Sequence, residues 1–163
     1  MRGDMQCRRQ VRGDRRAMTI WWHLPEDAIL AAAYLFEQAN GRALDEFEIG
    51  EIACHGLSGA DPALISETLK SAVLDEAKSD PAYRHTAYWA LGKRVDRELL
   101  SFFRDRLELE LLRDLETAYQ IMIALHNLDE PVFSKSRTGY GVREHALNRK
   151  DAEIYLASLN KNR

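Results

Sequence analysis

Apolar residues recur every three or four positions along most of the chain, and this spacing predicts amphipathic helices. No long run of β-branched residues alternates with polar ones, which is the pattern expected of a half-buried strand. The nearest approach is the five-residue alternation at 107–111, which has no partner strand elsewhere in the sequence. We interpret it as the end of a helix, so the pattern predicts an all-α fold.

Aspartates mark the starts of several predicted helices. Asp61 and Asp80 each precede a proline, and proline suits the first turn of a helix because the N–H that it lacks has no partner there. Asp45 with Glu48 matches a capping box. With Asn-Gly at 40–41 and Gly56 as stop signals, about seven helices are predicted, over residues 25–39, 45–56, 61–78, 80–92, 96–107 and 114–130 and in a short final helix capped by Asn148.

The helix that begins at Asp80 is repeated 34 residues later. At this offset Asp80 falls on Asp114, and the alanine and leucine at 90–91 fall on the same pair at 124–125. Between the two copies lies another helix with a single apolar stripe. A helical unit recurring with this period is typical of stacked helical hairpins, in which each hairpin buries its neighbour's apolar face.

The first copy also has a recognisable order of residues. Asp-Pro is followed by an arginine, by small residues and by Ala-Leu-Gly, and then by an apolar second helix; the positions concerned are Asp80, Pro81, Arg84, Ala87, Ala90, Leu91 and Gly92. In this order the segment at 80–107 resembles a HEAT-type repeat. The second copy departs from the pattern at Ala118 and His126, and the match over 24–78 is weak. The resemblance implies a short HEAT-like stack that mainly binds other proteins.

Charge is strongly segregated along the chain, although the net charge is only −3. Residues 1–17 hold six Arg against two Asp, and residues 133–163 hold seven Lys or Arg against three acids. Residues 18–132 hold ten basic against twenty-one acidic residues, and so acidic a body attracts basic partners and repels nucleic acid. We therefore expect a disordered basic arm over 1–17, a helical domain over 18–132, and a basic loop and final helix over 133–163 packed on that domain.

The basic arm has no apolar periodicity and no apolar core of a signal peptide. The character of the sequence changes at Met18, where the arginine-rich arm ends, so we expect translation to begin there naturally. The longest apolar run, at 28–36, is too short to span a bilayer. Two cysteines, Cys7 and Cys54, are too few to make a disulfide framework, so we expect a reducing setting. These features predict a cytoplasmic protein with no membrane partner.

No motif for catalysis or metal binding is present. Glu51, Cys54 and His55 are close in sequence, but adjacent helical residues point about 100° apart and do not readily share one ion. The chain contains no Cys-x-x-Cys, no His-x-x-x-His and no phosphate-binding Walker pattern. We therefore expect a protein that is not an enzyme and that needs no metal or cofactor.

Three side chains of the helix beginning at Pro81 lie opposite its predicted packing seam: His85, Tyr88 and Trp89. Aromatic side chains dominate the energetics of protein interfaces, so an exposed set would mark a contact surface. The alternative is that the helix packs between two neighbours, which would bury these side chains as well.

Charge supplies two further candidate surfaces. The acidic residues Asp45, Glu46, Glu48 and Glu51 would steer a basic partner, although solvated helix starts would look the same. The basic loop carries Arg137, Tyr140 and Arg143, which would contact a partner or close over the acidic body of the same chain.

These observations favour a non-catalytic protein that binds another, basic protein. Small, acidic chains of this helical type resemble some bacterial immunity proteins, which block a basic toxin nuclease. A generic adaptor or regulatory subunit is one alternative, and nucleic-acid binding through the basic arm and loop is another. Self-association through the ends of the stack also stays open, because a short stack must cap or pair its ends.

Overall fold

The computed structural model describes residues 24–75 and 79–161, so the predicted basic arm at 1–17 and the position of Met18 lie outside the described residues. The described part consists of helices joined by loops and contains no strand, which confirms the all-α prediction of about seven helices. The helices are α1 (Glu26–Ala39), α2 (Glu46–Cys54), α3 (Pro62–Leu74), α4 (Pro81–Lys93), the 3-10 helix η2 (Arg97–Leu99), α5 (Leu100–Arg113), α6 (Leu115–Asn127) and α7 (His145–Asn160).

Aspartate side chains cap the starts of the helices as predicted. The carboxylates of Asp61, Asp80 and Asp114 each accept a hydrogen bond from a backbone N–H in the first turn. Asp45 and Glu48 form the complete capping box, in which each side chain accepts a hydrogen bond from the other residue's backbone N–H. These local interactions fix where α2, α3, α4 and α6 begin.

Several of the predicted boundaries differ from the structure. The third helix ends at Leu74, because Asp75 leaves the helical conformation; Lys78, the predicted end, lies outside the described residues. Asp96 caps the 3-10 helix and not an α-helix, and α5 then runs to Arg113. The alternating stretch at 107–111 is therefore helical, as interpreted.

The prediction that Asn148 caps the last helix was wrong. Helix α7 begins three residues earlier, and Asn148 is buried within it. Its side-chain N–H donates to the carbonyl of Gly141 at 2.9 Å, and its side-chain oxygen accepts from Arg137 at 2.9 Å. Asn148 therefore ties the preceding loop to the helix, because its polar groups are satisfied by that loop and not by the helix start.

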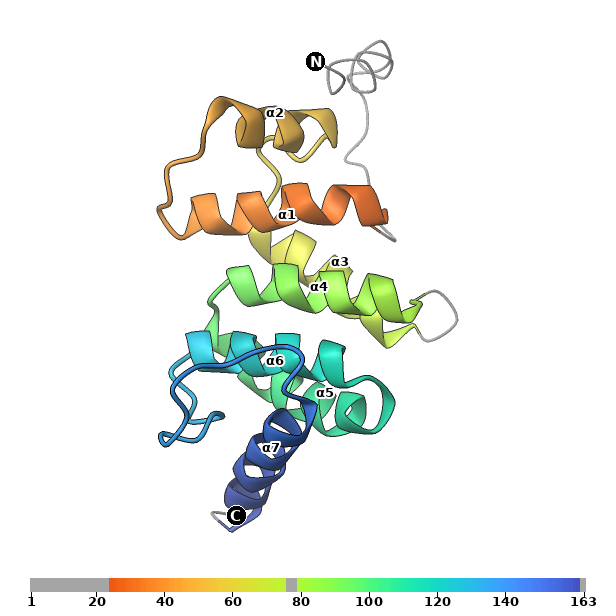
Figure 1. Ribbon diagram of the computed structural model, residues 1–163. Coiled ribbons are helices and arrows are strands. Elements are labelled where there is room, and N and C mark those ends of the chain that lie inside the picture. The colour runs from red at the N-terminus through yellow and green to blue at the C-terminus, as the bar shows by residue number, and fades with distance from the viewer. Residues whose placement is uncertain (1–23, 76–78, 162–163) are drawn as a thin grey trace.

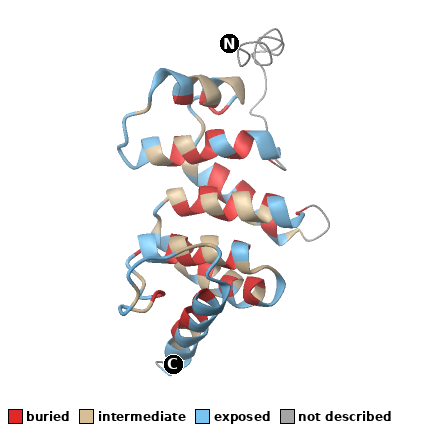
Figure 2. Ribbon diagram, viewed as in Figure 1, coloured by how far each residue is buried: buried red, intermediate tan, exposed pale blue. Residues whose placement is uncertain are grey.

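Three helices, α1, α4 and α6, form one layer in which they lie side by side and run in the same direction (Figure 1). Helix α3 packs against α1 and α4, α5 packs against α6, and α2 lies on α1 at one end of the stack. Helix α7 crosses the other end, against α5 and α6. Figure 2 shows that buried residues gather where these helices face one another.

Small side chains allow α4 and α6 to approach closely. Helix α6 begins and ends 34 residues after α4, so the two occupy equivalent places along the layer. A Cβ atom placed on Gly92 of α4 would lie 3.1 Å from the Cβ of Ala124 on α6. The absence of a side chain at Gly92 therefore sets the separation of these two helices.

Longer side chains bridge α4 and α5. The Nε of Arg84 donates to Glu110 at 3.0 Å, and one terminal nitrogen of Arg84 donates to the carbonyl of Ser79 at 3.0 Å. The Glu110 side chain is fully buried. A buried carboxylate needs such a partner, because removal of a charge from water is unfavourable unless the charge is paired.

The approach of α4 to α6 can be tested with a pair of glycine variants. Gly92→Val should lower the free energy of unfolding by about 1–3 kcal/mol, because the added atoms overpack the contact with Ala124. Gly50→Ala in α2 is the control: its Cβ would meet no atom within 4 Å, so helix propensity should raise stability by up to about 1 kcal/mol. Urea unfolding measures both, and equal stability of the two variants would contradict the close approach.

The buried ion pair generates a second prediction. Arg84→Met should lower the free energy of unfolding by about 3–5 kcal/mol, because it leaves the carboxylate of Glu110 buried without its charged partner. The double variant Arg84→Met/Glu110→Leu should recover most of this loss, since no buried charge is then left unpaired. A double variant as unstable as the single one would show that the arginine acts through packing and not through charge.

Candidate protein-binding surface

The aromatic set predicted on α4 does not form a surface. Tyr88 is fully buried, and burial raises the pKa of its hydroxyl to about 12. Trp89 is half-buried against the core, with the ammonium of Lys93 5.5 Å from its ring centre. His85 is also half-buried. The prediction of Tyr88 as a contact residue is therefore corrected: α4 packs against α1 and α6, and long side chains of α5 cover it as well.

The acidic set on α2 divides into internal and exposed members. Asp45 and Glu48 are occupied by the capping box, and Glu48 is also bound by the guanidinium of Arg42. Glu51 is half-buried and lies 3.7 Å from the imidazole of His55. Glu46 is exposed and is the member most available to a partner.

The basic loop closes on its own chain. Arg137 donates hydrogen bonds to Glu144 at 2.6 Å and to Asp151 at 2.9 Å, and its side chain is almost completely buried. Tyr140 stacks on Phe133 with a ring-centre separation of 4.0 Å. Of the three predicted loop residues, Arg143 alone is exposed without such a structural role.

These predicted sets do not meet in space. Helix α2 lies at one end of the stack, and the basic loop and α7 lie at the other end (Figure 1). The acidic and basic sets therefore form two separate surfaces of opposite charge, one at each end of the molecule.

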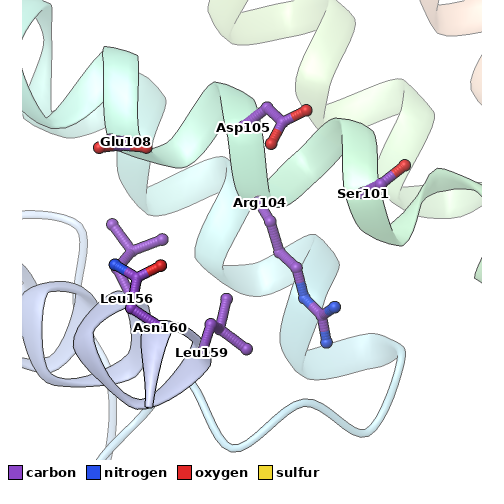
Figure 3. A pocket seen from close by; sticks show the side chains of 7 residues that line it. All are labelled: Ser101, Arg104, Asp105, Glu108, Leu156, Leu159 and Asn160. Atoms are coloured by element: carbon purple, nitrogen blue, oxygen red, sulfur yellow. The ribbon is translucent and has the colours of Figure 1, made fainter. Parts of the chain in front are cut away.

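A groove that none of the predicted sets includes runs between α5 and α7. It has a volume of about 440 Å³ and is open to solvent. Figure 3 shows Leu156 and Leu159 projecting from α7 toward α5, and Arg104 projecting from α5 into the space between the helices. The lining residues are Ser101, Arg104, Asp105 and Glu108 of α5 and Leu156, Leu159 and Asn160 of α7.

The two walls of the groove differ in chemistry. The wall on α5 presents the exposed carboxylates of Asp105 and Glu108, which are three residues apart and share one face of the helix. The wall on α7 presents Leu156 and Leu159 with the same spacing, and both are half-buried. One wall is therefore anionic and the other apolar.

Arg104 holds the two walls in position. Its Nε donates to the hydroxyl of Tyr155 on α7 at 2.9 Å, and a terminal nitrogen donates to Glu130 at 2.7 Å. The hydroxyl of Tyr155 in turn donates to the same carboxylate oxygen of Glu130 at 2.5 Å. We call these three residues the Arg104 triad. It connects α5, the loop after α6, and α7.

The protonation states in the triad follow from these contacts. Desolvation by burial raises the pKa of Glu130, but hydrogen bonds from Arg104 and Tyr155 outweigh it, so the pKa lies below its ordinary value of 4.5. Burial, and then the hydrogen bond to Glu130, raise the pKa of Tyr155 to about 12. At neutral pH the carboxylate is therefore ionised and neutralises the guanidinium. The charge that the groove offers to a ligand comes from Asp105 and Glu108.

Other kinds of site find little support. Among the described residues no group of three or more His, Cys, Asp or Glu side chains is placed to hold a metal ion. Within the same residues, no helix has both the length and the apolar character that a membrane crossing requires.

The Arg104 triad should make stability depend on pH. A carboxylate whose pKa is lowered by folding stabilises the folded state above its unfolded pKa, near 4.5, and loses that contribution as the pH falls through the lower folded pKa. At neutral pH, Glu130→Gln should lower the free energy of unfolding by about 1–3 kcal/mol. The difference from the unsubstituted chain should shrink below pH 4.5, as measured by urea unfolding. Glu98→Gln, at an exposed position, is the control, and a difference that does not change with pH would contradict this assignment.

Comparison with known proteins adds no family to this description. The chain matches no protein-family model, and neither a curated protein nor a solved structure matches it significantly. The resemblance to HEAT-type repeats therefore rests on the residues that carry it, and function has to be argued from the groove and the surfaces of this chain.

Proposed function

We propose that this protein binds a basic, partly apolar segment of another protein in the groove between α5 and α7, without catalysing a reaction on it. The observation that carries the proposal is the pairing of an anionic wall, Asp105 and Glu108, with an apolar wall, Leu156 and Leu159. Lysine and arginine side chains match both walls, because their carbon chains pack on apolar surface while their charged ends reach a carboxylate.

The shape of the groove supports a helical or extended segment as the ligand. Its walls are two helices, and an amphipathic helix laid into such a groove buries its apolar side against leucine side chains. Arg104, at the base of the groove, would not repel a cationic ligand, because Glu130 already neutralises it.

The charge of the whole chain supports the same class of partner. Residues 24–132 carry a large excess of carboxylates, which raises the rate at which a basic partner is encountered. The basic loop supports nucleic-acid binding less well, because Arg137 is engaged by Glu144 and Asp151.

The most concrete form of the proposal is an inhibitor or immunity protein that occupies a basic toxin and neutralises it. The HEAT-like order of residues at 80–92 supports recognition by analogy, since stacks of this type mainly bind proteins. An adaptor that holds a basic segment of a larger assembly would use the same groove in the same way.

A synthetic amphipathic helix of leucine and lysine, labelled with a fluorophore, tests the groove by fluorescence anisotropy. Asp105→Asn combined with Glu108→Gln should weaken binding roughly five- to tenfold, because two partly exposed ion pairs are lost. Glu26→Gln combined with Asp27→Asn removes the same two charges from the exposed start of α1 and should leave the affinity nearly unchanged.

Two results would contradict the proposal. If the peptide does not bind the unsubstituted chain, the groove has no affinity for basic amphipathic segments. If both pairs of substitutions weaken binding equally, the peptide responds to the overall negative charge and not to the groove.

A further inference from the structure

We propose that copies of this chain associate head to tail, with the outer face of α2 in one copy packing on the outer face of α7 in the next. This interface is separate from the α5–α7 groove and goes beyond the proposed function. The proposal rests on two unpartnered helix faces, one at each end of the stack, that are both partly apolar and are opposite in charge.

The face on α2 is apolar and acidic. Its inward side, with the buried Glu48 and Ile52, packs on α1. Outward, Phe47 is 64% exposed and Ile49 is 52% exposed, and the exposed Glu46 lies on the same side. Gly50 lies between the two large side chains in the helical projection, and a Cβ there would meet no atom within 4 Å. A second helix can therefore approach the backbone of α2 closely, between two apolar side chains.

The face on α7 is apolar and basic. Leu147 is 48% exposed and Ile154 is 58% exposed, and these residues lie two helical turns apart on one side of α7, next to the face that is buried. Lys150 lies between them along the helix and close to the same side, and the exposed Arg143 precedes the helix in sequence. The spacing suits packing across the small residues of α2, with the leucine and isoleucine as knobs.

The opposite charges of the α2 end and the α7 end favour a second copy of this chain as the binding partner. Residues 24–75, which form the α2 end, contain ten acidic and two basic residues, whereas residues 133–161 at the α7 end contain six basic and three acidic ones. Two α2 ends or two α7 ends would repel each other, so the favoured contact joins unlike ends. A stack of helices also has to cap or pair its terminal faces.

A contact between unlike faces leaves one free face of each kind in every dimer. Association of this type continues into a ring or a short filament and does not stop at two copies. It should weaken as salt is added, because salt screens the attraction between exposed charges. A two-fold dimer would instead have a fixed mass and would need like faces to meet.

Two substitutions, one in each face, test the proposal by light scattering after gel filtration. The full chain should show a mass that rises with concentration above the 18.7 kDa of one copy and that falls when salt is added. Gly50→Gln places a side chain on the α2 face at a position with free space, and Lys150→Glu reverses the charge of the α7 face. Each variant alone should remain at the mass of one copy.

A mixture of the two variants separates head-to-tail pairing from every other arrangement. Gly50→Gln keeps an intact α7 face and Lys150→Glu keeps an intact α2 face, so an equimolar mixture should form a dimer that grows no further. Circular dichroism confirms that each variant is folded. As the control, Asp105→Asn/Glu108→Gln in the groove should associate like the unsubstituted chain, so failure of this proposal is distinguishable from failure of the groove.

Three results would overturn the proposal. The first is a mass of one copy at all concentrations up to the solubility limit. The second is association that neither face variant reduces, and the third is a mixture of the two variants that does not pair.

Discussion

The close approach of α4 to α6 determines how the central helices of the molecule pack. It requires Gly92, because a side chain there would press on Ala124. With α4 and α6 this close, and α1 packed on the other side of α4, the three helices form one parallel layer (Figure 1). That layer covers α4 on both sides, so Tyr88 becomes part of the core, and it fixes the end of the stack that α7 crosses.

The α7 end of the stack is held by polar contacts as well as by apolar packing. Arg104 joins α5 to α7 and to Glu130, and Arg137 joins the preceding loop to Glu144 and Asp151. Hydrogen bonds to charged groups are stronger than neutral ones, and each of these arginines contacts more than one element. They hold α7 against α5, where the two helices form the walls of the groove. Some charged side chains, such as Arg104 and Arg137, therefore hold the fold together. Others, such as Asp105 and Glu108, are left to form a binding surface.

Much of the fold could be predicted from local signals, because aspartate caps and Asp-Pro pairs act within one helical turn. The offset between Asp80 and Asp114 anticipated the equivalent positions of α4 and α6. The helix boundaries and caps that were predicted wrongly have a common cause, because tertiary contacts determine them and local sequence does not. Asn148 was assigned to a helix start, but its partners are Gly141 and Arg137. The groove could not be predicted, because its walls are about fifty residues apart and its opening depends on how α7 crosses α5.

Backbone NMR of the chain mixed with the leucine–lysine helix shows whether the space between α5 and α7 receives a basic segment. If it does, amide shifts should change chiefly at residues 101–108 of α5 and at residues 156–160, near Asp105, Glu108, Leu156 and Leu159. Amides of α1 and α2 should stay unchanged although those helices belong to the more acidic end. Shifts that spread over α2, or that leave residues 156–160 unaffected, would contradict it.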